Sequence, residues 1–114
     1  MSASAVNATS VLGVRLRSRR KALGLSQEKI GVSIGLDESC SRTRISRYET
    51  GAHEPALATS KLIADALDVP LAYLYCESDT LAEIIRLTNQ LEPQTQTEVL
   101  SYLQKNIEEQ TSST

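Results

Sequence analysis

Apolar residues recur at three- and four-residue intervals along most of the 114-residue chain, a period typical of amphipathic helices. No stretch alternates regularly between apolar and polar positions, as a half-buried strand does. Leu12, Leu16 and Leu23 share one face of a first predicted helix, which Gly24 ends. We therefore expect an all-α fold.

Two shorter apolar stripes follow. Ser26 is a suitable N-cap for a second helix over about residues 27–34, and Gly35 ends that helix. Ile45 and Tyr48 are three residues apart and predict the inner face of a third helix. Two short helices joined by a glycine turn, the second rich in arginine, suggest a helix-turn-helix.

Two proline-marked segments complete the first unit. The apolar pattern of residues 56–67 predicts a fourth helix that closes before Pro70, because the residue before a proline disfavours the helical conformation. Pro70 itself suits the first turn of a short fifth helix ending at Tyr75. We expect residues 11–76 to form one five-helix domain and residues 1–10 to be a disordered tail.

The remaining residues predict a helical hairpin over residues 77–110, followed by a disordered tail at 111–114. Ser78 or Asp79 caps its first helix, and Pro93 begins its second. Each helix carries an apolar stripe along one face, a plausible surface for homodimerisation; the alternative is that the hairpin only packs on its own chain. The residues of the predicted dimer surface are Leu81, Ile84, Ile85, Leu91, Val99, Leu100, Leu103 and Ile107.

Composition excludes several other classes of protein. No apolar run approaches the roughly 18 residues of a membrane span, and the N-terminus lacks the features of a signal peptide. Cys40, Cys76 and His53 have no metal-ligand spacing, and two unpatterned cysteines fit a reducing cytoplasm. No catalytic constellation or phosphate loop is present. We therefore expect a cytoplasmic protein that is no enzyme and needs no metal or cofactor.

The net charge of −2 hides two opposite halves. Residues 11–50 contain nine basic and four acidic side chains, whereas residues 51–114 contain three basic and ten acidic ones. This asymmetry indicates that the first half faces a polyanion, and that the acidic half stays away from it.

Several separated motifs now occur in order: LGLSQEKI (23–30), ISRYETG (45–51) and IADALDVPLAYLY (63–75). Together they resemble the phage-repressor-like, or Xre-type, helix-turn-helix transcriptional regulators over about residues 11–76. The resemblance implies a five-helix domain that places its third helix in the major groove of double-stranded DNA. It also implies dimeric binding to a palindromic operator.

The resemblance assigns roles to individual residues. Arg42, Thr43 and Arg47 fall where base-reading side chains usually lie, and arginine donors match the acceptors of guanine. Arg20 and Glu49 match a pair that forms a salt bridge in relatives, although Arg20 could instead contact phosphate. The residues predicted to contact phosphate are Ser26, Gln27, Arg44, Ser46, Thr50 and Arg20.

The chain departs from the family pattern before its third helix. Ile45 lies ten positions after Gly35, four more than the family usually has. The extra residues either enlarge the turn or lengthen the helix. We favour Ser41 as the N-cap, with residues 36–40 as loop; Ser39 as the N-cap would lengthen the helix.

The leading functional prediction is therefore a sequence-specific DNA-binding regulator, most simply a repressor that occupies its operator as a homodimer. An antitoxin or a restriction–modification controller of the same fold is an alternative. A protein-interaction module that has lost DNA binding is another, but such a module would not need an arginine-rich helix.

Overall fold

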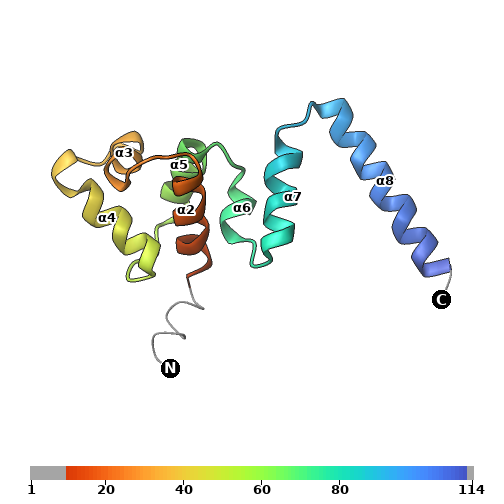
Figure 1. Ribbon diagram of the computed structural model, residues 1–114, viewed down its shortest axis with the longest axis horizontal. Helices are drawn as coiled ribbons and strands as arrows, with labels where there is room; N and C mark the ends of the chain where they lie inside the picture. The colour runs from red at the N-terminus through yellow and green to blue at the C-terminus, as the bar shows by residue number, and fades with distance from the viewer. Residues whose placement is uncertain (1–9, 113–114) are drawn as a thin grey trace, which may run out of the picture.

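The computed structural model describes residues 10–112, and this range is all-α, as expected (Figure 1). Its seven helices are α2 (Val11–Ala22), α3 (Gln27–Ser33), α4 (Glu38–Thr50), α5 (Leu57–Leu67), α6 (Leu71–Tyr75), α7 (Asp79–Asn89) and α8 (Pro93–Ser112).

The predicted tails need partial correction. Residues 1–9 and 113–114 lie outside the described range, so the structure does not bear on them. Ser10 is buried at the start of α2, where its carbonyl accepts the N–H of Val14. Residues 111 and 112 belong to α8, because the helical pattern of the preceding residues continues through them.

The core forms around α2, which lies between α4 on one side and α6 with α7 on the other (Figure 1). Leu12 and Leu16 from α2 belong to one apolar cluster with side chains of every other helix up to α7. The buried apolar residues are Leu12, Leu16, Ile30, Ile45, Tyr48, Ile63, Ala64, Leu67, Val69, Tyr73, Leu74 and Ala82. The prediction that Ile45 and Tyr48 anchor the third helix is thus confirmed.

Leu23 is an exception to the predicted stripe. Because α2 ends at Ala22, Leu23 lies in the turn beyond the helix and is exposed. Leu25 packs against the core in its place. A periodic spacing therefore does not guarantee burial once the helix has ended.

The C-terminal helices behave differently from each other. α7 packs on α6, buries Ala82 and places Ile85 against the core. α8 buries no side chain and runs away from the rest of the molecule (Figure 1). Gln96 donates a hydrogen bond from Nε2 to the carbonyl of Thr88, 2.8 Å away, across the turn. The predicted hairpin is therefore open: α8 is joined to α7 across the turn but buries no side chain against it.

α3 and α4 are in close contact at Gly31, where the backbone of α3 lies directly against Ser41 of α4. A Cβ atom at this position would lie 2.5 Å from the Cβ and 2.8 Å from the Cα of Ser41 in α4. Both residues are buried. Glycine is therefore required because the two backbones approach so closely.

We expect Gly31→Ala to destabilise the protein. Alanine gains about 1 kcal/mol of helix propensity, but overpacking a tight contact costs about 1–3 kcal/mol. The free energy of unfolding in urea should fall by up to about 2 kcal/mol. The control is Val32→Ala at the exposed neighbouring position, which should change it little. A stabilised Gly31→Ala variant would show that α4 moves away freely.

Candidate nucleic-acid interface

α4 begins earlier than we favoured. Asp37 is its N-cap, the helix starts at Glu38, and the four extra residues lengthen the helix. The N–H of Ser39 donates to Asp37 Oδ2 at 3.0 Å, and the Ser39 hydroxyl also donates to this carboxylate. These two hydrogen bonds, the hydroxyl first, lower the pKa of Asp37. The N-cap prediction for Ser41 is wrong, and so is the loop prediction for residues 38–40, whereas residues 36 and 37 do lie outside the helix.

The reason lies in the position of Ser41 on the helix. Ser41, Ile45 and Tyr48 follow one another at intervals of four and three, so all three face the core. The Ser41 hydroxyl donates to the carbonyl of Asp37 at 2.9 Å, and this bond satisfies it in the interior. The side chain that we took for a cap is instead the small inner residue that lets α4 pass close to Gly31.

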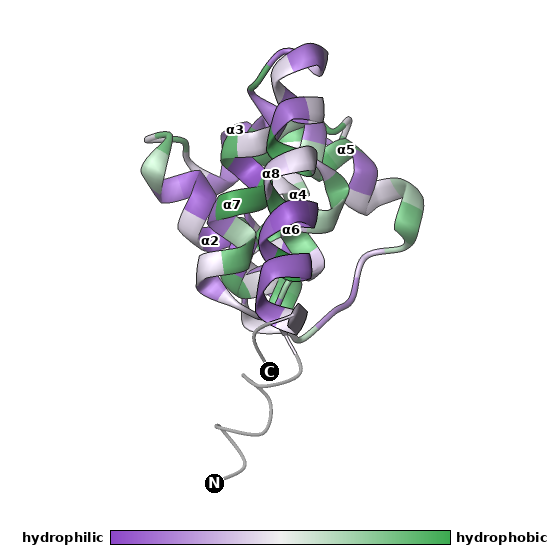
Figure 2. Ribbon diagram, turned by 90° about the vertical axis from the view of Figure 1, so that its right-hand side faces the viewer, coloured by the Kyte–Doolittle hydropathy of each residue, from purple (hydrophilic) through white to green (hydrophobic). Residues whose placement is uncertain are grey.

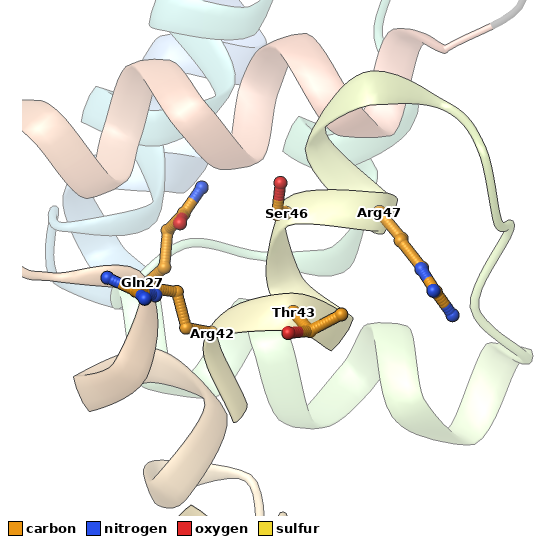
Figure 3. A pocket seen from close by; sticks show the side chains of 5 residues that line it. All are labelled: Gln27, Arg42, Thr43, Ser46 and Arg47. Carbon is orange, nitrogen blue, oxygen red and sulfur yellow. The ribbon is translucent and has the colours of Figure 1, made fainter. Parts of the chain in front are cut away.

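The opposite side of α4 holds a hollow of about 420 Å³ (Figure 3). It gathers the three residues predicted to read bases, one residue from the start of α3 and one further serine. Its lining is Gln27, Arg42, Thr43, Ser46 and Arg47. Arg42 and Arg47 are exposed, so their guanidinium groups are available to an external ligand.

Arg44 does not line this hollow. It is two residues from Arg42, and residues two apart do not share a helix face. Arg44 is exposed on the other flank of α4. The arrangement therefore separates a central group, Arg42, Thr43 and Arg47, from a flanking arginine.

Two further predicted phosphate contacts, Ser26 and Thr50, lie outside the lining of this hollow. Ser26 is exposed and accepts the N–H of Lys29 at 3.0 Å as the N-cap of α3. Thr50 is exposed at the last turn of α4, and its hydroxyl donates to the carbonyl of Arg47. Gly51 follows with φ of 83°, a left-handed conformation that favours glycine and ends the helix.

Glu49 connects α4 to the two helices beside it. Arg20 of α2 donates from Nε to Glu49 Oε2 at 2.6 Å and from Nη2 to Glu49 Oε1 at 3.2 Å. Gln27 of α3 donates from Nε2 to Glu49 Oε1 at 3.0 Å. The side chains of Arg20 and Glu49 are only 11% and 4% exposed. This carboxylate therefore joins three helices in a largely dry environment.

Arg20 also donates from Nη1 to the carbonyl of Leu25 at 2.9 Å. Its guanidinium group is thus used inside the fold, between α2, the following turn and α4. Of the two roles considered for Arg20, the salt bridge is the one observed.

Comparison with known proteins agrees with this geometry. A model of the helix-turn-helix family HTH_3 matches residues 16–74. The chain belongs to the helix-turn-helix family. This helix-turn-helix protein is 34% identical over 64 residues to uncharacterized HTH-type transcriptional regulators from Sinorhizobium medicae (strain WSM419) and Rhizobium meliloti (strain 1021). These matches cover 56% of this chain but 43% of each relative, so the chain spans less than half the length of these curated relatives.

A solved structure extends the similarity. The crystal structure of the transcriptional regulator BswR superposes with a TM-score of 0.77 and is 38% identical. The match covers 82% of this chain and 92% of BswR. The match therefore extends beyond residues 16–74 and includes part of the C-terminal helices.

Not all cations of the helix-turn-helix domain face outward. Arg15 is buried, and Arg19 donates from Nε to the carbonyl of Leu67 at the end of α5, 3.1 Å away. The charge pattern alone places Arg15 and Arg19 in the half of the chain that faces a polyanion. The signal that identifies them is their spacing, because positions 15 and 19 continue the inner stripe of Leu12 at intervals of three and seven.

Two further classes of site find no support in the described range. None of the helices within residues 10–112 is long and apolar enough to cross a membrane. In the same range, no three potential ligand side chains gather where a metal ion could bind.

We expect Glu49→Ala to be strongly destabilising, because it leaves Arg20 and Gln27 without their acceptor in a dry environment. Breaking a buried ion pair typically costs about 3–5 kcal/mol, and urea denaturation should show a loss of about 3 kcal/mol. Glu38→Ala, at an exposed position of the same helix, is the matched control. A loss below about 1 kcal/mol, the size of a surface ion pair, would contradict the connecting role of Glu49.

Proposed function

We propose that this protein is a transcriptional regulator that binds an operator as a homodimer and represses by occupying it. The observation that carries the proposal is the hollow on α4, where Arg42, Thr43 and Arg47 gather on the face opposite Ile45 and Tyr48. One face of the helix is held by the core, and the other is available to read DNA. The relatives given above are named transcriptional regulators, which supports the same class.

The dimensions of α4 suit this function. A helix with its side chains is about 10–12 Å wide, and the major groove of B-DNA is about 12 Å wide. Arginine donates two hydrogen bonds to the O6 and N7 atoms of guanine, and threonine contacts several bases. Arg42 and Arg47 are thus candidates for reading guanine, with Thr43 between them.

Contacts to phosphate position the helix in the groove. Ser26 and Gln27 lie at the N-terminus of α3, where backbone N–H groups and the helix dipole favour an anion. The Gln27 amide uses one hydrogen for Glu49 and keeps the other for a phosphate oxygen. Arg44, Ser46 and Thr50 are candidates for phosphates on either side of the groove.

The dimer is proposed to form through α7 and α8. Apolar side chains along both helices are exposed, and α8 buries no side chain against the described part of its own chain. Figure 2 looks at the molecule from the α8 side, with apolar (green) and polar (purple) positions interspersed along the ribbon. Of the predicted dimer residues, Ile85 packs against its own core and is removed from the set. Leu87 is exposed between Ile84 and Leu91 and joins it.

The test of DNA reading is selection of bound duplexes from a random pool, run in parallel with the wild type and with Arg47→Ala. The wild type should enrich an inverted repeat. The variant should lose preference at one position in each half-site, with affinity reduced by about 5- to 150-fold, the equivalent of one bidentate pair. Lys61→Ala, at an exposed position of α5, is the control. An unchanged motif with Arg47→Ala would exclude this helix face as the reader.

Salt dependence tests the phosphate contacts. Affinity for the selected duplex should fall by orders of magnitude between about 50 and 200 mM salt as counterions are released. A flat dependence would contradict the contacts proposed for Ser26, Gln27 and Arg44.

The double substitution Leu103→Asp with Ile107→Asp tests the dimer surface. Both side chains are exposed on α8, so the fold should be unchanged while two carboxylates enter the apolar surface. Sedimentation should show dimers for the wild type and monomers for the variant. The control is Ser101→Asp, which changes the charge of an exposed polar position on the same helix. If the double variant stays dimeric, the interface lies elsewhere.

A further inference from the structure

Arg15 is a buried cation whose hydrogen bonds all go to residues at the connection between α6 and α7. Its side chain is 8% exposed. Nε donates to the carbonyl of Cys76 at 2.9 Å, Nη2 to the carbonyl of Glu77 at 3.1 Å and Nη1 to Asp79 Oδ1 at 2.8 Å. The guanidinium carbon lies 5.9 Å from the centre of the Tyr73 ring. This arginine is therefore unavailable to DNA and needs another explanation.

The hydrogen bonds to the two carbonyls hold Arg15 more firmly than its ion pair with Asp79 does. Asp79 is 92% exposed, so water screens its attraction to Arg15 strongly. Cys76 and Glu77 lie in the short segment that turns the chain from α6 into α7, and their carbonyls accept two arms of one planar guanidinium. A planar group with fixed donor directions restrains the backbone path better than a single flexible amine does.

This restraint acts at the base of α7. Beyond it, α7 is attached to the domain through Ala82 and Ile85 on one side, while Leu81, Ile84 and Leu87 stay exposed. The direction of α7 relative to α2 is thus set by the contacts of Arg15 and by the packing of Ala82 and Ile85 against the core. α4 lies on the other side of α2 from α7 (Figure 1).

We propose that Arg15 is a positioning residue that sets the distance between the two half-sites recognised by a dimer. The inference rests on the proposed function, in which α7 and α8 form the dimer surface and α4 reads DNA. A tilt of about 10° over roughly 25 Å moves a helix by about 4 Å, more than the base-pair rise of about 3.4 Å. A small change at the base of α7 therefore changes which half-site spacing both α4 helices fit.

The experiment uses the full chain and three sets of duplexes derived from the wild-type selection: a single half-site, the selected inverted repeat, and repeats with spacers shortened or lengthened by one to three base pairs. The variant is Arg15→Lys, which keeps the charge but cannot reach three acceptors at once. We expect affinity and base preference on the single half-site to stay within twofold. The preference for the best spacer over its neighbours should fall at least fivefold.

Two further variants separate the components of this network. Asp79→Asn keeps an acceptor at an exposed position and should keep the spacer preference, because the two carbonyls still hold Arg15. Arg17→Lys makes the same chemical change at an exposed position of α2 and should also keep it. If Arg15→Lys fails to fold, one glycine inserted after Glu77 displaces α7 while leaving Arg15 in place, and it should broaden the spacer preference in the same way.

The possible failures are distinguishable. If the wild type enriches no sequence, the proposed function is wrong and this inference falls with it. If the wild type prefers one spacer and the folded Arg15→Lys or glycine-insertion protein keeps that preference unchanged, the inference alone is wrong. A loss of single half-site binding in parallel with the spacer effect would indicate a general structural role and would also overturn it.

Discussion

The carboxylate of Glu49 is the constraint on which the proposed interface depends. It accepts hydrogen bonds from Arg20 of α2 and Gln27 of α3, while its own residue belongs to α4. A charge in a dry environment is tolerated only with its partners in place, so the three helices are held in one arrangement. Gln27 lies both in this network and in the hollow of α4, which links the interior of the domain to its proposed DNA-binding face.

The division of cations follows from the same principle. Arg15, Arg19 and Arg20 each direct their guanidinium groups to backbone carbonyls or carboxylates inside the fold. Arg42 and Arg47 are exposed beside the hollow. The basic half of the chain is therefore not one uniform surface. Some of its charge holds helices together, and the rest is available to a polyanion.

Prediction from the sequence succeeded where local chemistry decides the outcome. The Ser26 cap, Gly35 after α3 and the inner pair Ile45 and Tyr48 were all predictable, because caps, left-handed residues and helical periodicity act over a few residues. The start of α4 was not. Asp37, Ser39 and Ser41 are all good N-caps, and only the contact of Ser41 with Gly31 selects among them. That contact joins two helices, and no short stretch of sequence contains it.

The same limit applies to the C-terminal helices. Their amphipathic stripes were visible in the sequence, but a stripe does not say which surface covers it. Ile85 turned out to face its own core, whereas Leu103 and Ile107 remain exposed on α8. The charge of Arg15 assigns it to the surface that faces a polyanion, whereas its spacing of three residues from Leu12 places it on the inner face of α2, where it is buried.

The Glu49 network is proposed to hold the DNA-reading face in place. The most direct measurement is the affinity of folded Glu49→Gln protein, well below its melting temperature, for the wild-type selected duplex and for an unrelated duplex. The amide accepts weaker hydrogen bonds and leaves the Arg20 charge unbalanced. Specific affinity should fall at least about tenfold with non-specific affinity unchanged. Equal affinities of variant and wild type for the selected duplex would contradict the role of Glu49 at the DNA-reading face.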